Sequence, residues 1–194
     1  MNKIVVVIFF FSVAMSEELK IGSLMPKTRH ILNDISGENI TLADAKGESG
    51  TLVIFSCNTC PWVIRWEDRY VSVAEKYIPM GIGIIAVNSN SGRFRGSDSM
   101  EAMIEHADKQ NYNFPYAQDP GSELAYAFGA TKTPHIYLFD KNNFLVYRGA
   151  IDDNAKDKNF VDEPFLTNAL DELLDGAPIS KKTSKAIGCS IKFK

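Results

Sequence analysis

Thr51-Leu52-Val53-Ile54-Phe55-Ser56-Cys57-Asn58-Thr59-Cys60-Pro61 is the stretch of sequence that decides the fold. Residues 51–56 form a nearly continuous apolar and β-branched run, which is typical of a central strand buried on both faces. Two cysteines follow directly, and Pro61 opens an amphipathic stretch that reaches Tyr77. Proline is well tolerated in the first turn of a helix, where its missing N–H costs nothing. We therefore predict a buried strand, then a dithiol, then a helix.

The sequence on both sides of this stretch continues the alternation of strands and helices. Strand patterns cover residues 31–35, 40–42, 81–87, 113–117, 135–139 and 144–147, and helical patterns cover 98–110, 122–128 and 162–174. Asp98 or Ser99 is the predicted cap of the helix at 98–110, and Gly129 ends the next one. This order predicts an α/β sandwich whose central mixed β-sheet is flanked by helices.

Composition limits the function classes. The chain has 194 residues, of which 45% are hydrophobic and 23% charged, so it suits one domain with a real core. Its formal net charge of −3 points away from a polyanion partner, and we expect no nucleic-acid site.

Residues 1–16 read as a secretory signal peptide. Lys3 precedes an apolar run over residues 4–11 that is too short for a stable transmembrane helix, and small residues at Ala14 and Ser16 suit a cut before Glu17. The alternatives are an uncleaved anchor and a buried strand. We expect a periplasmic or secreted protein with no stable membrane insertion after cleavage.

Four segments follow from these patterns. Residues 1–16 are the signal peptide, 17–30 a loose leader, 31–179 the folded domain, and 180–194 a Lys-rich C-terminal tail that carries Cys189. In an exported protein disulfides persist, and three cysteines leave at least one thiol over.

Cys57 and Cys60 form a C-x-x-C pair at a strand–helix junction, which is typical of a redox dithiol. A thiolate near the positive end of a helix has a lowered pKa and attacks disulfides. We predict that Cys57 lies beside the free N–H groups and is the nucleophile. Cys60 would resolve it by closing a Cys57–Cys60 disulfide. A structural disulfide and half of a zinc site are the alternatives.

The sequence resembles the peroxiredoxin-like branch of the thioredoxin superfamily, the alkyl hydroperoxide reductase and thiol-specific antioxidant group. The resemblance covers residues 21–194 and is most specific at 55–63 and 187–192, with further agreement at 66–69, 88–90, 128–130 and 147–153. It implies a thioredoxin-like fold in which Thr133 and a cis-Pro134 shape the substrate groove beside the dithiol.

The resemblance also implies either thiol–disulfide exchange or thiol-dependent peroxide reduction. Peroxiredoxins carry Pro-x-x-x-Thr-x-x-Cys, whereas positions seven and three before Cys57 are Gly50 and Ile54, and those before Cys60 are Val53 and Cys57. Neither frame supplies the threonine hydroxyl that helps to hold peroxide. The two residues inside the C-x-x-C also differ from those of thioredoxin, and they influence the redox potential.

Four further residues are candidate accessories. Pro61 starts the helix. Arg148 can steer a substrate or stabilise a thiolate, although a solvated ion pair is the simpler role. His135 can poise a proton or be an ordinary edge histidine. Cys189 can be a distal resolving thiol, part of another disulfide, or a free thiol. Trp66 is expected in the core.

These observations leave three functional hypotheses. The first is an exported thiol–disulfide oxidoreductase that acts on protein or small-molecule disulfides and thiols, needs an electron donor, and has no cofactor beyond its redox-active disulfide. The second is a peroxiredoxin-like thiol peroxidase whose substrate is peroxide. The third is a copper-binding envelope protein with Cys57, Cys60 and His135 as ligands.

Overall fold

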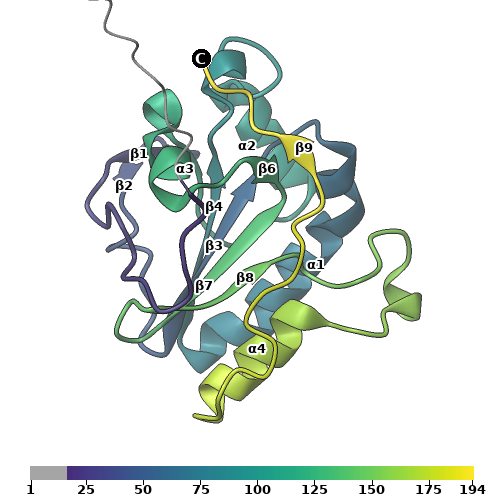
Figure 1. Ribbon diagram of the computed structural model, residues 1–194. Coiled ribbons are helices and arrows are strands. Elements are labelled where there is room, and N and C mark those ends of the chain that lie inside the picture. Colours follow the sequence, from purple (N-terminus) through teal and green to yellow (C-terminus); the bar gives the residue numbers. More distant parts are fainter. Residues whose placement is uncertain (1–16) are drawn as a thin grey trace, which may run out of the picture.

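β3 (Gly50–Ser56) is buried at every position, as the unbroken run at residues 51–56 predicted. It pairs in parallel with β4 (Ile82–Asn88) and antiparallel with β7 (His135–Asp140), so it lies in the middle of a mixed sheet. The computed structural model describes residues 17–194, which Figure 1 shows in colour. The expected signal peptide, residues 1–16, lies outside the described residues.

Seven strands form the main sheet in the order β2-β1-β5-β4-β3-β7-β8, and β6 and β9 form a separate ladder. The mixed sheet with helices on its faces confirms the predicted fold class. The remaining elements are β1 (Leu32–Asp34), β2 (Asn39–Ile40), β5 (Tyr116–Gln118), β6 (Lys132–Thr133), β8 (Leu145–Gly149), β9 (Cys189–Ser190), α1 (Pro61–Tyr77), α2 (Met100–Lys109), α3 (Glu123–Phe128) and α4 (Phe165–Leu174).

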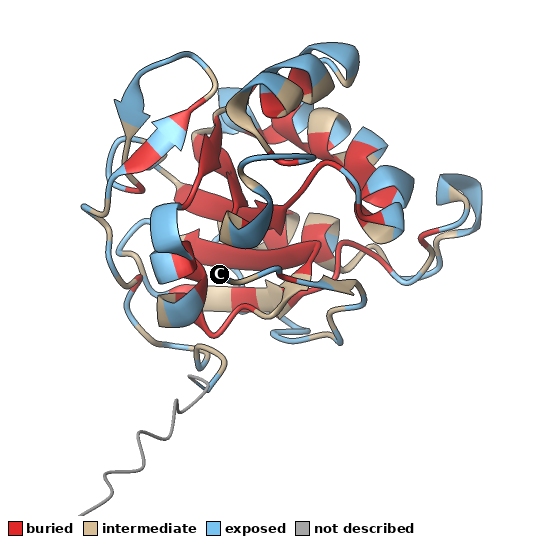
Figure 2. Ribbon diagram, turned by 90° about the horizontal axis from the view of Figure 1, so that it is seen from above, coloured by how far each residue is buried: buried red, intermediate tan, exposed pale blue. Residues whose placement is uncertain are grey.

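Alternate residues of β3 enter two different cores. Leu52 and Ile54 pack under α1, α2 and α4, whereas Val53 and Phe55 pack under α3 on the opposite face. Figure 1 shows the helices on both sides of the sheet, and Figure 2 shows the central strands buried between more exposed layers. Because both faces are covered, successive positions of β3 must be apolar, which explains the continuous run in the sequence.

Helix boundaries follow the local chemistry. α1 has the predicted bounds, and the side chain of Ser99, rather than Asp98, caps α2 by accepting from Ala102 N. α4 begins at Phe165 and not at residue 162, because Pro164 disfavours helical geometry in the residue before it. Within residues 17–194, no helix combines the length and apolar character needed to cross a membrane.

The leader at residues 17–30 is not loose, contrary to expectation. Leu19 N donates to Phe128 O at 2.9 Å, and Gly22 N donates to Leu145 O at 2.8 Å. The side chain of Leu19 also packs against the core under α3. Backbone groups near the core must find partners, and these bonds fix the leader on the domain.

The tail from residue 180 also packs on the domain (Figure 1). Thr183 forms a parallel bridge with Arg148 of β8, and farther on β9 pairs antiparallel with β6, with Cys189 opposite Thr133. Strands of two residues have no detectable hydrophobic period, so the sequence did not predict this ladder.

The core under α3 gives a direct test of packing. Phe128 is fully buried and makes edge contacts with Phe55, Tyr137 and Phe139. Phe128→Ala should lower the free energy of unfolding by roughly 3–5 kcal/mol, because it leaves a cavity. Urea denaturation measures this. Phe160→Ala, at a side chain 69% exposed, is the matched control and should change stability by less than about 0.5 kcal/mol. Equal losses would contradict this account of the core.

Candidate active site

The four residues Cys57 to Cys60 connect the end of β3 to the start of α1. Cys60 is the N-cap of α1, with φ −75° and ψ 121°, and Pro61 takes the first helical position. The spacing alone predicts Cys57 beside the free N–H groups of the helix, and the structure corrects this: Cys60 is there. The reason is Pro61, whose fixed backbone suits the first helical residue and sets the helix start one position after Cys60.

Both thiols face the segment before Pro134. Cys57 Sγ lies 3.2 Å from Thr133 Oγ1, and Cys60 Sγ lies 3.1 Å from Thr133 O. The Thr133–Pro134 peptide bond is cis, as the family resemblance implied. Cys57 and Cys60 are each only 3% exposed, and both are free thiols in this structure. The Cys57–Cys60 disulfide therefore stays a prediction.

A hydrogen bond between the two thiols moves their pKa values apart. The Cys57 thiol lowers the pKa of Cys60 to about 4, against the effect of burial, with further help from Cys189 and the Val63 N–H. The same hydrogen bond from the other side, then burial and the charge of Asp98, raise the pKa of Cys57. The Cys60 thiol also donates to the Thr133 carbonyl oxygen, which favours its protonated form, whereas the donors named above favour its thiolate. These contacts favour ionisation of Cys60 over ionisation of Cys57.

Asn58 holds the loop between the cysteines in one shape. Its backbone N donates to Asp98 Oδ1 at 3.0 Å, its side-chain amide donates to Ser97 O at 2.9 Å, and Tyr116 Oη donates to its Oδ1 at 2.8 Å. A loop fixed by backbone and side chain together keeps the two sulfurs within reach of each other.

Asp98 is the functional residue that the sequence did not reveal, since its position before a helix suggested a cap. It is fully buried and accepts from Asn88 Nδ2 at 2.9 Å and from Asn90 Nδ2 at 3.0 Å. These two asparagines belong to the segment 88–90 that carried part of the family resemblance. The resemblance at residues 88–90 was therefore the feature of the sequence from which a polar network beside the dithiol could have been predicted.

His135 and Arg148 meet at Glu18 and not at the thiols. His135 Nε2 lies 3.0 Å from Glu18 Oε1, and Arg148 pairs with the other oxygen of the same carboxylate. His135 is buried in β7 between β3 and β8, so it is not an edge histidine. Burial, followed by the charge of Lys132, lowers the pKa of His135 to about 4. Arg148 already neutralises Glu18, so burial prevails and the imidazole is neutral at pH 7.

Cys189 is the accessory residue that the structure brings to the dithiol. It is half-buried and packs against the core that contains Cys57 and Cys60. Burial and a hydrogen bond to Cys60 raise the pKa of Cys189, so it is a thiol that donates to the Cys60 sulfur. The backbone N–H of Trp62, in the first turn of α1, also points at Cys189.

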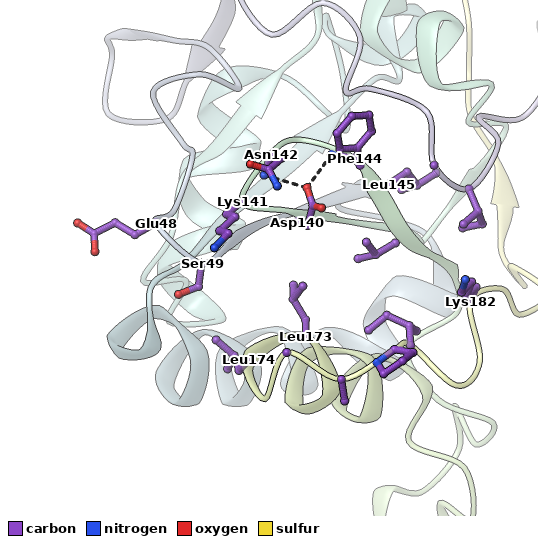
Figure 3. A pocket seen from close by; sticks show the side chains of 17 residues that line it. Glu48, Ser49, Asp140, Lys141, Asn142, Phe144, Leu145, Leu173, Leu174 and Lys182 are labelled. Carbon is purple, nitrogen blue, oxygen red and sulfur yellow. Dashed lines mark hydrogen bonds between the residues drawn. The ribbon is translucent and has the colours of Figure 1, made fainter.

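A large cavity lies away from this chemistry. Figure 3 shows it between α4, the β7–β8 turn and the leader, with a volume of about 810 Å³ and no cysteine among its lining residues. The Asp140 side chain there accepts from backbone N–H groups of its own turn. A smaller hollow of about 320 Å³ lies nearer the thiols, beside Trp62 and Ile187, which flank Cys60 and Cys189 in the sequence. We place the active site at the thiols because only they carry redox chemistry.

The structure does not assemble the copper ligands considered above. No three His, Cys, Asp or Glu side chains in the described part of the chain are placed to hold a metal ion. His135, the third ligand of that hypothesis, is directed at Glu18.

Comparisons with known proteins identify the family and the fold of this chain. The AhpC/TSA family profile matches residues 21–148, and no curated protein matches the chain. An uncharacterized conserved protein from Geobacillus kaustophilus is 36% identical, with a TM-score of 0.84 over 92% of this chain and 95% of that one. A hypothetical protein from Sinorhizobium meliloti 1021 is 30% identical, with a TM-score of 0.83 over 92% and 97%.

A more distant structure shares the fold. A putative protein disulfide isomerase from Bacteroides thetaiotaomicron is 15% identical, with a TM-score of 0.60 over 81% of this chain and 91% of that one. The family profile covers well over half of the sequence, and it includes the dithiol, Thr133 and Pro134. The chain belongs to the AhpC/TSA family and has a thioredoxin-like fold.

Proposed function

We propose that this protein is a thiol–disulfide oxidoreductase in which Cys60 is the nucleophile and Cys57 the resolving thiol. The observation that carries the proposal is the position of Cys60 at the N-cap of α1, where the Val63 N–H reaches its sulfur. A thiolate at a helix N-terminus is stabilised by the helix dipole and by free N–H donors. This reverses the order that spacing alone suggested.

Exchange then proceeds in two balanced steps. The Cys60 thiolate attacks one sulfur of a substrate disulfide, which forms a mixed disulfide and releases the other substrate sulfur as a thiolate. Cys57 next attacks Cys60 Sγ, which forms the Cys57–Cys60 disulfide and releases the second substrate sulfur. The departing thiolate takes up the proton that Cys57 loses. Two electrons pass from the dithiol to the substrate; Cys57 supplies one proton, and the substrate thiolate released in the first step takes its proton from solvent.

Thr133 supports the second step. The contact of its hydroxyl with Cys57 Sγ lowers the pKa of that thiol, against the larger opposing effects of the Cys60 contact and burial. Once Cys60 is bound in a mixed disulfide, its negative charge is gone and Cys57 ionises more readily. The Thr133 hydroxyl would thus favour the Cys57 thiolate in the mixed disulfide, when Cys57 has to attack Cys60.

The remaining elements of the proposal rest on sequence. The apolar run at residues 4–11 and the small residues Ala14 and Ser16 support export to a periplasmic or secreted location. The dithiol itself supplies two electrons, so the proposed reaction needs no resident cofactor. Disulfides or thiols of proteins or small molecules are the proposed substrates, with a separate electron donor.

The order of the thiols can be tested by titration. Thiolate absorbance of the reduced protein should persist below the usual cysteine pKa of about 8.5 and fall only as the pH approaches about 4. Cys60→Ser should remove this low-pH thiolate, whereas Cys57→Ser should keep part of it, because a serine hydroxyl can still donate to Cys60. If Cys57→Ser removed the low-pH thiolate and Cys60→Ser kept it, Cys57 would be the nucleophile.

Trapping tests the reaction itself. With Cys189 also replaced, a Cys57→Ser/Cys189→Ser variant should accumulate a stable mixed disulfide at Cys60 when mixed with insulin, seen by mass spectrometry. Cys60→Ser should exchange no faster than background. If Cys60→Ser still reduced insulin disulfides at the wild-type rate, the proposed function would be wrong.

Peroxide reduction is the second candidate, favoured by the family assignment. We expect it to be slow, since the Thr133 hydroxyl contacts Cys57, whereas Cys60 faces the Thr133 carbonyl oxygen. Stopped-flow oxidation of the reduced protein by hydrogen peroxide should match that of a free thiol. A much faster reaction, with loss of two hydrogens, would make the protein a peroxidase.

A further inference from the structure

The C-terminal segment lies against the dithiol as a strand. β9 pairs antiparallel with β6, and the pair Thr133–Cys189 brings Cys189 to the residue that contacts both sulfurs. Figure 1 shows this segment, in yellow, beside β6 and the start of α1. The backbone hydrogen bonds between β9 and β6 therefore hold Cys189 close to Cys60.

Gly188 permits this close approach. A methyl group at this position would overlap the Thr133 carbonyl and lie 3.2 Å from Pro134 N. The tail is also fixed on the far side of Cys189, where Ile191 N donates to Thr131 O at 2.9 Å and Lys192 N donates to Asn90 Oδ1 at 2.8 Å. The position of Cys189 is thus set by residues before and after it.

The three sulfurs form an ordered series. Cys57 and Cys60 are 3% exposed, and Cys189 is the outermost, in partial contact with solvent. Cys60 contacts both of the others, and the first turn of α1 contributes the Val63 N–H to Cys60 and the Trp62 N–H to Cys189. Cys60 is thus the central member of the series.

We propose that Cys189 is a third redox thiol, and that a Cys60–Cys189 disulfide is a working state of the protein. Cys189 Sγ, as a thiolate, attacks Cys60 Sγ of the Cys57–Cys60 disulfide. The Cys60–Cys189 bond forms as the Cys57–Cys60 bond breaks, and Cys57 leaves as a thiolate that takes the proton Cys189 has lost. The number of electrons is unchanged, so the step needs no outside reagent. It rests on the proposed function, which supplies the first disulfide.

The test uses Cys57→Ser, in which Cys189 is the remaining partner for Cys60, with oxidised glutathione as the probe. We expect glutathione to attach at Cys60 and then to be displaced by Cys189. The product has lost two hydrogens, carries no glutathione, and yields a Cys60–Cys189 linked peptide. The matched control, Cys57→Ser/Cys189→Ser, should keep one glutathione at Cys60.

A second variant tests the role of the strand. Gly188→Ala in the Cys57→Ser background should slow the displacement of glutathione by roughly tenfold or more, because the methyl group pushes β9 off Thr133. Gly96→Ala is the matched control, since its nearest neighbour outside the adjacent residues is 3.8 Å away, and it should leave the rate unchanged.

The outcomes separate the two proposals. A glutathione adduct in Cys57→Ser as stable as that in the double variant would overturn the role of Cys189 and leave Cys60 as the nucleophile. No adduct at Cys60 in either variant, together with unreactive wild-type protein, would overturn the proposed function and the third thiol with it. Formation of the Cys60–Cys189 disulfide without exchange activity on insulin would support the third thiol alone.

Discussion

The contact between the Cys60 sulfur and the first turn of α1 is the interaction on which the site depends. A charge buried in a protein is costly unless donors surround it, and this sulfur is 3% exposed. The donors are the Cys57 thiol, the Cys189 thiol and the Val63 N–H. Each comes from a different part of the chain, so the thiolate requires β3, α1 and β9 to be in place together. Residues from three separate segments thus supply the hydrogen bonds that water would otherwise give to the Cys60 sulfur.

A buried carboxylate adds to the difference between the two thiols. Asp98 is fully buried, and its carboxylate oxygens accept from three neutral groups, namely Asn58 N, Asn88 Nδ2 and Asn90 Nδ2. The hydrogen bond with Cys60 and burial raise the pKa of Cys57, and the negative charge of Asp98 raises it further, which favours the protonated thiol that donates to Cys60. The Val63 N–H lowers the pKa of Cys60, and the Asp98 carboxylate raises the pKa of Cys57, so both add to the difference between the two thiols. This assigns different roles to two cysteines that the motif treats alike.

Sequence reasoning succeeded where one local pattern was sufficient. The buried run of β3, the bounds of α1 and the mixed sheet follow from hydrophobic pattern and from Pro61. It failed where position depended on contacts between distant segments. Spacing could not show whether helix N–H groups reach Cys57 or Cys60, because the two cysteines are three residues apart and the folded position of each sulfur relative to the start of α1 decides it. The β6–β9 ladder joins residues more than fifty positions apart through strands of two residues, which leave no periodic signal.

Burial of the dithiol imposes a last constraint on how electrons reach it. An electron donor that reduces the Cys57–Cys60 disulfide must approach a sulfur closely and in line, and β9, which pairs with β6 and is anchored by backbone bonds, lies beside that disulfide. Moving the tail aside would break the β6–β9 pairing and expose Ile191, which is 4% exposed in its core. Under the proposal of a third redox thiol, the donor need not move the tail, since it can attack the partly exposed Cys189 of a Cys60–Cys189 disulfide. Under this proposal, the segment that lies against the dithiol also carries the thiol through which electrons reach it.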